Sequence, residues 1–187
     1  MKSIGILGGT FDPPHIGHLI IANDVCHAQQ LDEVWFMPSY EPPHKESAAA
    51  DTMDRVAMLE RVTADNPLFK VETTEVNRLG KSFTFDTMKW LQEAHPDTSF
   101  YFIIGADMVE NLPRWRHIEQ LLEMVTFVGV NRKGYTINSH YAIRTMDVPL
   151  MEISSTAIKN RVRSEKTIKY MVPESVETYI KENRLYE

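Results

Sequence analysis

Two histidines, His15 and His18, stand three residues apart directly after the glycine-containing segment Gly8–Pro14. The apolar run Ile4–Leu7 before it is typical of a buried strand, and the residues that follow are typical of a helix start. A strand that ends in glycines and leads into a helix commonly forms an anion site, because backbone N–H groups and the positive end of the helix dipole meet there. Two imidazole rings at such a site indicate that a phosphate group is acted on as well as held.

Other interpretations of the two histidines explain less of the segment. The glycines match neither the G-x-G-x-x-G pattern of dinucleotide-binding turns nor the G-x-x-x-x-G-K-S/T pattern of P-loops. A zinc site needs more ligands, and the sequence has neither an H-E-x-x-H motif nor a pair of cysteines, so we expect no metal bound by side chains alone. A plain turn with a capping or core histidine accounts for either histidine singly but not for both together.

A second group of phosphate-binding candidates stands near the other end of the chain, where Ser154, Ser155 and Thr156 begin a helical pattern. Hydroxyl groups at a helix start cap the helix, and together with the first N–H groups they also suit phosphate oxygens. Lys159 and Arg161 follow within the helix. Basic runs of this kind are usually solvated helix faces, but these two cations are near enough to the hydroxyl groups to reach a triphosphate.

The candidate phosphate-binding residues are positioned by strands and helices, which the sequence indicates as short apolar runs alternating with helical patterns. Strands are expected over residues 4–7, 33–38, 68–73, 99–104, 125–130 and 145–148. A turn is expected over residues 77–81. Helices are expected over residues 16–30 and 51–64, and after Ser82–Thr87 as far as His95. Further helices are expected on both sides of the break Leu112–Trp115, and from Ser154 onward with an interruption near Pro173. This alternation predicts an α/β fold with a doubly wound, mainly parallel sheet, helices on both faces and a small helical part at the C-terminus.

Ligands of a doubly wound sheet bind beyond the carboxyl ends of its strands, where the strand order reverses. This rule places four segments with unusual chemistry on one rim, namely Gly8–His18, Pro42–Lys45, Gly105–Asp107 and Arg132. Asp107, just past a strand end, is expected either to bind a ribose hydroxyl or to cap the next helix.

The bulk composition excludes several classes of protein. The 187 residues fit one domain, and 43% hydrophobic with 25% charged residues excludes a disordered or fibrous chain. A net charge of −6 has the wrong sign for a protein whose main partner is nucleic acid. The single cysteine, Cys26, fits a reducing compartment, and no apolar run is long enough for a signal peptide or a membrane span. We therefore expect a cytoplasmic chain with one domain, residues 1–187, and no nucleic acid or membrane partner.

Two segments resemble signatures of one superfamily. Gly8–His18 resembles the HxGH signature of the nucleotidyltransferases, a superfamily that includes class I aminoacyl-tRNA synthetases, and Ile153–Lys159 resembles their second signature, ISSTxIR. Within the superfamily the chain resembles the bacterial nicotinate-nucleotide adenylyltransferases almost end to end, which implies a Rossmann-like nucleotidyltransferase fold. The supporting segments are Pro42–Lys45, Phe83–Thr87, Ile103–Asp107 and Pro113–Trp115.

The resemblance implies a reaction and its cofactor. An adenylyl group passes from ATP to nicotinate mononucleotide, giving nicotinate adenine dinucleotide and pyrophosphate in a step of NAD biosynthesis, with Mg²⁺ bound with the ATP. The attacking phosphate oxygen is already ionised, so catalysis requires positioning and charge neutralisation rather than a strong general base. As the catalytic residues, His15 and His18 would donate hydrogen bonds to the α- and β-phosphate oxygens.

The resemblance also implies which residues touch each substrate. The ATP-binding set is Gly8, Gly9, Thr10, Phe11, His15, His18, Gly105, Asp107, Ser154, Ser155, Thr156, Lys159 and Arg161. Lys45 and Arg132 would hold the 5′-phosphate of the mononucleotide. Thr84 would meet the carboxylate of its pyridine ring, and Trp115, otherwise a core residue, would stack on that ring.

Two positions depart from the family pattern. Lys159 stands where arginine is preferred, and lysine keeps the charge but loses the bidentate fork of a guanidinium. Either Lys159 or Arg161 is therefore the main triphosphate contact. Arg116 stands where tyrosine is frequent, so recognition of the ring is expected to differ in detail.

Three other functions compete with this one. A related adenylyltransferase would act on phosphopantetheine or nicotinamide mononucleotide, although Thr84 and Trp115 favour an aromatic acid. A tRNA-acting module would explain the sequence His-Ile-Gly-His, but the chain lacks a KMSKS segment and is acidic. A non-catalytic nucleotide-binding module would keep the glycine turn without needing both histidines. A homo-oligomer is compatible with each of these functions.

Overall fold

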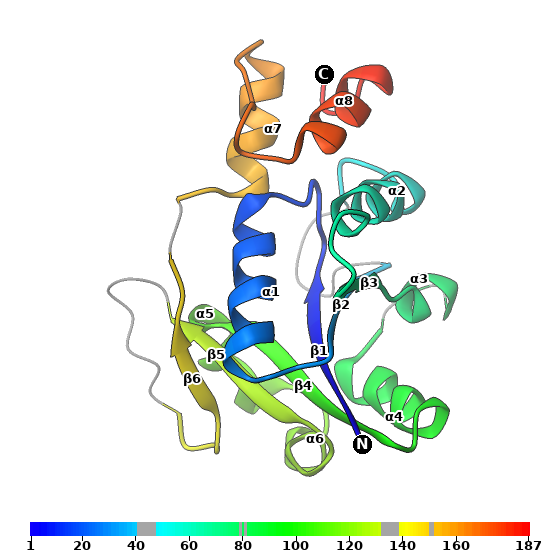
Figure 1. Cartoon of the computed structure of the whole chain (residues 1–187), viewed down its shortest axis with the longest axis vertical. Coiled ribbons are helices and arrows are strands. Elements are labelled where there is room, and N and C mark those ends of the chain that lie inside the picture. The colour runs from blue at the N-terminus through cyan, green and yellow to red at the C-terminus, as the bar shows by residue number, and fades with distance from the viewer. Residues whose placement is uncertain (41–47, 79, 81, 132–138, 150–151) are drawn as a thin grey trace.

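The computed structural model describes residues 1–40, 48–78, 80, 82–131, 139–149 and 152–187 of the chain. Its centre is a six-stranded sheet in the order β3-β2-β1-β4-β5-β6, in which every pair of neighbouring strands is parallel (Figure 1). The strands are β1 (Lys2–Gly9), β2 (Glu33–Pro38), β3 (Phe69–Val71), β4 (Thr98–Gly105), β5 (Thr126–Asn131) and β6 (Arg144–Asp147). The predicted parallel α/β sheet is confirmed.

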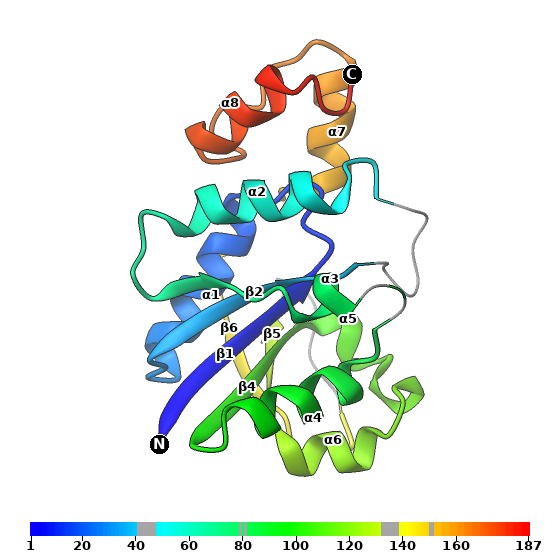
Figure 2. The same cartoon turned by 90° about the vertical axis from the view of Figure 1, so that its right-hand side faces the viewer.

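Helices cover both faces of this sheet. They are α1 (Ile16–Ala28), α2 (Thr52–Thr63), α3 (Thr74–Arg78), α4 (Thr84–Ala94), α5 (Ala106–Val109), α6 (Ile118–Met124), α7 (Ser155–Arg163) and α8 (Glu174–Glu182), with a 3₁₀ turn, η1, at Leu112–Arg114. Figure 2 shows α4 and α6 on one side of the sheet, α1 and α2 on the other, and α7 and α8 stacked beyond α2. None of the helices in the described part of the chain combines the length and apolar character needed to cross a membrane.

The alternation of side chains along β1 divides the core between the two faces. Ile4 and Ile6 pack in one cluster with Leu91 of α4, whereas Leu7 packs in a second cluster with Val25 of α1. Both faces of this central strand are therefore buried, as expected for a parallel sheet between two layers of helices.

A third core cluster joins α2 to the C-terminal helices. Its buried members are Ala50, Met58, Val62, Ile158, Ile168, Val172, Val176, Ile180 and Tyr186. The segment 164–173 between α7 and α8 is not helical, which is a longer break than the one expected near Pro173. The cause is packing, because Ile168 and Val172 are each only 3% exposed and anchor the segment in this cluster.

The strand order reverses beside β1, and this reversal fixes where a ligand can bind. The chain runs outward from β1 through β2 to β3 and then crosses to β4, which pairs with the other side of β1. Leu7 is in register with Ile103, so Gly9 and Gly105 end the two strands at the same edge of the sheet. Ligands of doubly wound sheets bind beyond such an edge.

The segment after β3 differs from the expectation. β3 ends at Val71 and α3 begins at Thr74, where Oε1 of Glu72 accepts hydrogen bonds from the backbone N–H (2.8 Å) and the hydroxyl (2.6 Å) of Thr74. The expected turn over residues 77–81 is wrong in its first two residues, which are helical. Gly80 does have a turn conformation, with φ of 83°.

The start of α4 also differs from the expectation, since the helix begins at Thr84 rather than after Thr87. The cause lies in tertiary structure. The hydroxyl of Thr87 is fully buried and donates to Oε1 of Glu75 at 3.0 Å, which joins α4 to α3. Burial raises the pKa of Glu75.

Candidate active site

Glycine shapes the turn after β1. A Cβ atom on Gly9 would lie 3.1 Å from the ring of Phe11, so the glycine lets this ring pack inward, where Phe11 is 2% exposed. Phe11 itself has a left-handed backbone conformation, with φ of 52°, and redirects the chain toward α1. Gly8 is exposed at the sheet edge. The predicted segment from Gly8 through Thr10 to Phe11 therefore lies where β1 leads into α1.

The two histidines form a stacked pair at the N-terminus of α1. His15 is the N-cap residue and is 8% exposed, and the centroids of its ring and the ring of His18 are 3.7 Å apart at an interplanar angle of 23°. The backbone N–H of His15 donates to Nδ1 of His18 at 3.2 Å. Because Nδ1 accepts, the ring proton of His18 is on Nε2, which is therefore a hydrogen-bond donor. Phe11 supports this ring edge-on, with the centroids 5.0 Å apart.

Gly17 contributes to the site although no role is predicted for it from the sequence. A Cβ atom there would lie 3.1 Å from both Cε1 and Nδ1 of His15, which is closer than ordinary van der Waals contact. The absence of a side chain at Gly17 thus gives the His15 ring its place beside His18. The spacing His-x-Gly-His is the sequence signal for this arrangement.

The N-terminus of α7 lies against the same turn (Figure 1). The hydroxyl of Ser155 donates to the carbonyl oxygen of Pro13 at 2.9 Å, across 142 residues of sequence. Ser154 is the N-cap residue of α7, where its hydroxyl accepts from the N–H of Ala157 at 3.1 Å, and Thr156 is exposed in the first turn. Two helix N-termini therefore meet at one place, an arrangement suited to the charge of phosphate groups.

Of the two candidate triphosphate cations, Lys159 faces the turn and Arg161 does not. Nζ of Lys159 forms an ion pair with Oδ2 of Asp12 at 2.7 Å, and the lysine side chain is 20% exposed. Nε of Arg161 instead donates to the carbonyl oxygen of Thr167 at 2.7 Å, in the segment that follows α7. Of these two cations, the geometry favours Lys159 as the one nearer to the candidate phosphate site.

The buried guanidinium of Arg55 holds the turn after β1 in place, and no role is predicted for this residue from the sequence. Arg55 of α2 is 1% exposed, and its Nη1 donates to the carbonyl oxygens of Thr10 and Ser39, both at 2.8 Å. Its Nη2 donates to the carbonyl oxygen of Tyr40 at 3.2 Å and to the hydroxyl of Thr52 at 3.1 Å. Burial lowers the pKa of Arg55. Arg55 joins the chain after β1 to the chain after β2 and adds positive charge behind the candidate phosphate site.

Gly105 and Asp107 lie at the end of β4, beside the turn after β1. A Cβ atom on Gly105 would lie 2.6 Å from Oδ1 of Asp107, so a larger residue there would require this exposed carboxylate to shift. Asp107 is exposed in α5, and the N-cap residue of that helix is Gly105. The alternative role of Asp107 as the helix cap is therefore wrong, and its carboxylate stays a candidate for binding a ribose hydroxyl.

The start of α4 and the segment after η1 lie side by side. Nη1 of Arg116 contacts Oδ2 of Asp86 at 3.1 Å, and the guanidinium carbon lies 5.2 Å from the centre of the Phe83 ring. Thr84 and Trp115 are the chain neighbours of these contacting residues, so the structure brings the two predicted ring-binding residues into one region.

Trp115 packs in the core as well as lying in the region of the predicted ring-binding residues. Its ring packs edge-on against Phe102 and Phe127, with centroids 5.9 Å and 6.1 Å away, while the residue stays partly exposed. The other two predicted mononucleotide contacts, Lys45 and Arg132, lie outside the residues that the structure describes.

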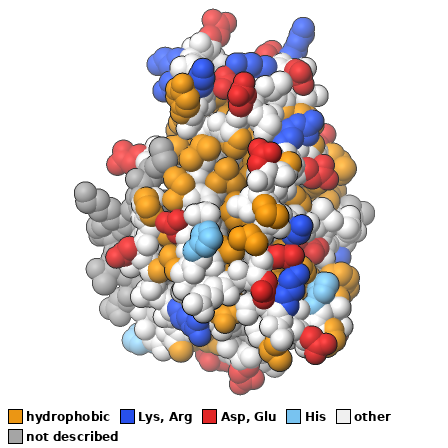
Figure 3. Space-filling model, in the orientation of Figure 1, with side chains coloured by type: hydrophobic (Ala, Val, Ile, Leu, Met, Phe, Trp, Pro, Cys, Tyr) orange, Lys and Arg blue, Asp and Glu red, His pale blue; other side chains and the backbone are white. Residues whose placement is uncertain are grey.

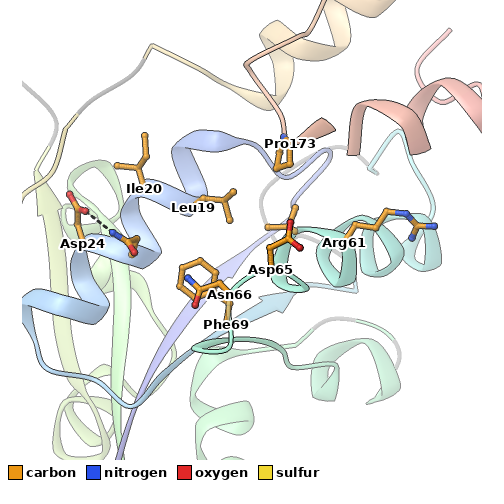
Figure 4. A pocket seen from close by; sticks show the side chains of 10 residues that line it. Leu19, Ile20, Asp24, Arg61, Asp65, Asn66, Phe69 and Pro173 are labelled. Carbon is orange, nitrogen blue, oxygen red and sulfur yellow. Dashed lines mark hydrogen bonds between the residues drawn. The ribbon is translucent and has the colours of Figure 1, made fainter. Parts of the chain in front are cut away.

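A groove of about 370 Å³ lies apart from the predicted site, between α1 and α2. Its lining residues are Leu19, Ile20, Asn23, Asp24, Arg61, Val62, Asp65, Asn66, Phe69 and Pro173 (Figure 4). Apolar side chains gather over the middle of the face that Figure 3 shows. The lining contains no predicted phosphate or ring contact, so the groove and the predicted site are separate features.

Comparisons with known proteins identify relatives of this chain. A model of the cytidylyltransferase-like family matches residues 6–161. A curated relative from Bacillus cytotoxicus, named "Probable nicotinate-nucleotide adenylyltransferase", is 53% identical over 100% of both chains. A relative of the same name from Lactiplantibacillus plantarum is 50% identical over 100% of this chain and 89% of its own length.

Solved structures share the fold. A nicotinic acid mononucleotide adenylyltransferase from Plasmodium falciparum, complexed with NaAD, has a TM-score of 0.83 at 21% identity, covering 100% of this chain and 98% of its own. A structure described as a putative nicotinate-nucleotide adenylyltransferase from Vibrio parahaemolyticus has a TM-score of 0.73 at 22% identity, with 100% and 96% of the two chains covered.

Proposed function

The chain belongs to the nicotinate-nucleotide adenylyltransferase family, and from this premise we propose that its two stacked histidines and paired helix N-termini carry out the adenylyl transfer. An adenylyl group passes from ATP to nicotinate mononucleotide, giving nicotinate adenine dinucleotide and pyrophosphate in NAD biosynthesis. The observation that carries the residue assignment is the hydrogen bond from Ser155 to Pro13, because it sets the start of α7 against the histidine turn.

The reaction requires positioning and charge neutralisation more than proton transfer. A phosphate oxygen of the mononucleotide forms a bond to the α-phosphorus of ATP, and the bond to the β-phosphate oxygen breaks with release of pyrophosphate. The attacking oxygen is ionised at neutral pH, so no group needs to remove a proton. Donors aimed at the phosphate oxygens lower the barrier because negative charge moves onto the leaving group.

The ATP side of the site is the turn after β1 with the start of α7. His15 and His18 would donate hydrogen bonds to phosphate oxygens in the transition state, His18 through its Nε2–H, and the backbone N–H of His15 holds the His18 ring. Lys159 and the N–H groups at the start of α7 would bind the β- and γ-phosphates. Asp107 at the end of β4 would bind a ribose hydroxyl.

Mg²⁺ would enter the site with ATP. The described residues contain no group of three or more His, Cys, Asp or Glu side chains placed to hold a metal ion. Mg²⁺ is commonly bound through substrate phosphates and water with few protein ligands, and the donor set here consists mainly of N–H groups and cations that would contact phosphate. When bound, the ion would neutralise charge on the pyrophosphate that leaves.

The substrate pair is tested directly. The protein is incubated with ATP and Mg²⁺ together with nicotinate mononucleotide, nicotinamide mononucleotide or phosphopantetheine, and pyrophosphate release is measured. The expected result is preferred turnover of nicotinate mononucleotide. Turnover of phosphopantetheine without turnover of nicotinate mononucleotide would contradict the proposed acceptor, and ATP binding without any turnover would support a non-catalytic module.

Trp115→Ala tests the ring subsite. Loss of the indole face removes stacking on the pyridine ring, so KM for nicotinate mononucleotide is expected to rise about tenfold while KM for ATP stays the same. Steady-state kinetics with each substrate varied in turn measures the difference. An unchanged KM for the mononucleotide would leave Trp115 with its core contacts to Phe102 and Phe127 alone.

The proposal also covers the domain organisation, the cellular location and the partners of the chain. Residues 1–187 form one nucleotidyltransferase domain, since α7 and α8 pack on α2 through the third core cluster. A cytoplasmic location without a nucleic acid partner is supported by the net charge of −6 and the single cysteine. A homo-oligomer is compatible with this site.

A further inference from the structure

Four donors surround the carboxylate of Asp12, which is 3% exposed in the turn after β1. Oδ2 accepts from Nζ of Lys159 at 2.7 Å and from the N–H of Ala49 at 2.9 Å. Oδ1 accepts from the hydroxyl of Tyr186 at 2.9 Å and from the N–H of Ala50 at 3.1 Å. A carboxylate has about four lone-pair directions, so both oxygens are saturated.

The ionisation states of this cluster are well defined. Burial on its own would raise the pKa of Asp12, but the hydrogen bonds from Lys159, the two backbone N–H groups and Tyr186 outweigh it, and the pKa of the carboxyl is lowered. Burial and the charge of Asp12 raise the pKa of Tyr186. At neutral pH the carboxylate is therefore ionised and the tyrosine hydroxyl always carries a proton to donate.

Tyr186 reaches this carboxylate from the next-to-last position of the chain. It is 7% exposed within the third core cluster, and the backbone N–H of Leu185 donates to the carbonyl oxygen of Ile180 at 3.0 Å, which attaches the tail to α8. The tyrosine is thus held by α8 on one side and bonded to the phosphate turn on the other, 174 residues away in sequence.

We propose that Tyr186 is a positioning residue for adenylyl transfer, because its bond to Oδ1 of Asp12 fixes the carboxylate whose Oδ2 holds Lys159 at the phosphate site. This inference rests on the proposed role of Lys159 in binding the triphosphate. Lys159 has several rotatable bonds, and within the described part of the chain its ammonium bonds to one side chain, that of Asp12. If the carboxylate rotates, the ammonium moves with it, and small displacements of a positioned group reduce catalysis strongly.

Tyr186→Phe tests the proposal by removing one hydroxyl and leaving the ring in the core. The expected result is a fall in kcat/KM for ATP of about tenfold, the size typical of one hydrogen bond to a charged group. KM for nicotinate mononucleotide is expected to stay the same. Initial rates are measured well below the melting temperature of each variant.

Tyr179→Phe is the matched control. The hydroxyl of Tyr179 also bonds to an aspartate, donating to Oδ1 of Asp54 at 2.8 Å, but this bond joins α8 to α2 and does not reach the phosphate turn. The two variants lose the same chemical group from the same part of the chain. Tyr179→Phe is expected to keep the kinetic constants of the wild type for both substrates.

A double-variant cycle with Lys159→Met shows whether Tyr186 acts through Lys159. Lys159→Met alone is expected to lower kcat/KM for ATP, and adding Tyr186→Phe is expected to lower it no further. Kinetics of Tyr186→Phe equal to those of Tyr179→Phe, or an equal fall with and without Lys159, would overturn the proposal. Turnover by the wild type in the same assay tests the proposed reaction separately, so failure of the reaction and failure of this inference are distinguishable.

Discussion

Replacing His18 with asparagine is expected to lower kcat about 10²- to 10³-fold, the range found when one donor to a transition-state oxyanion is removed. Nε2–H of His18 is assigned as a donor because its Nδ1 accepts from the backbone of His15 at 3.2 Å. Asparagine can still accept that bond through its side-chain oxygen, so the cap of α1 is retained. The fold is therefore expected to keep nearly all of its stability while the reaction loses the imidazole donor.

The matched control for this prediction is His27→Asn, which changes an exposed histidine in the last turn of the same helix. It is expected to leave kcat unchanged. Single-turnover rates with saturating ATP and nicotinate mononucleotide separate the chemical step from binding, and thermal unfolding reports stability. Turnover near the wild-type value in His18→Asn would remove His18 from the catalytic role.

The parts of the fold that depend on local chemistry are predictable from the sequence. Asp51 is expected to begin α2, and its Oδ1 does accept from the N–H of Asp54 at 2.8 Å. The apolar run of β1 and the glycines that follow identify the strand end and the turn before α1 in the same way. These features are determined by interactions between residues that are close in sequence, so they can be predicted from the segment alone.

The partners of the buried charges are not predictable in this way. Lys159 is expected to bind a triphosphate on the basis of charge and position, whereas its partner in the structure is Asp12, 147 residues away. Asp12 belongs to the recognised signature, yet no role is predicted for it from the sequence. Pairing across such a separation is decided by how α7 packs on the turn, which local patterns do not specify.

For Arg55, the buried position is predictable from the sequence, but the hydrogen-bond partners are not. Met58, Leu59 and Val62 follow it by three, four and seven residues, so helical periodicity places Arg55 on the buried face of α2. A buried guanidinium must be hydrogen-bonded, and this requirement is a usable signal for a structural role. The carbonyl oxygens that accept from its Nη1 and Nη2, on Thr10, Ser39 and Tyr40, become known only from the structure.

Replacing Asp12 with alanine is expected to lower the free energy of unfolding by about 3–5 kcal/mol, the usual cost of removing one partner from a buried ion pair. The substitution leaves Lys159 and the N–H groups of Ala49 and Ala50 without their acceptor. Asp51→Ala is the control, because it also removes an aspartate that accepts a backbone N–H, but at an exposed helix cap, and is expected to cost about 1 kcal/mol.

The part of this stability that depends on the charge of Asp12 is expected to be lost in acid. Its folded-state pKa lies below the ordinary value of 3.8, so the unfolded chain takes up this proton at a higher pH than the folded chain. The contribution is therefore complete above the unfolded-state pKa and is lost as the pH falls through the folded-state pKa. Denaturant unfolding of the wild type and Asp12→Ala should give a constant difference at neutral pH, and a difference that narrows below about pH 4. A difference that stays the same throughout acid would show that the carboxylate charge does not stabilise the turn, and that the loss in Asp12→Ala comes from packing.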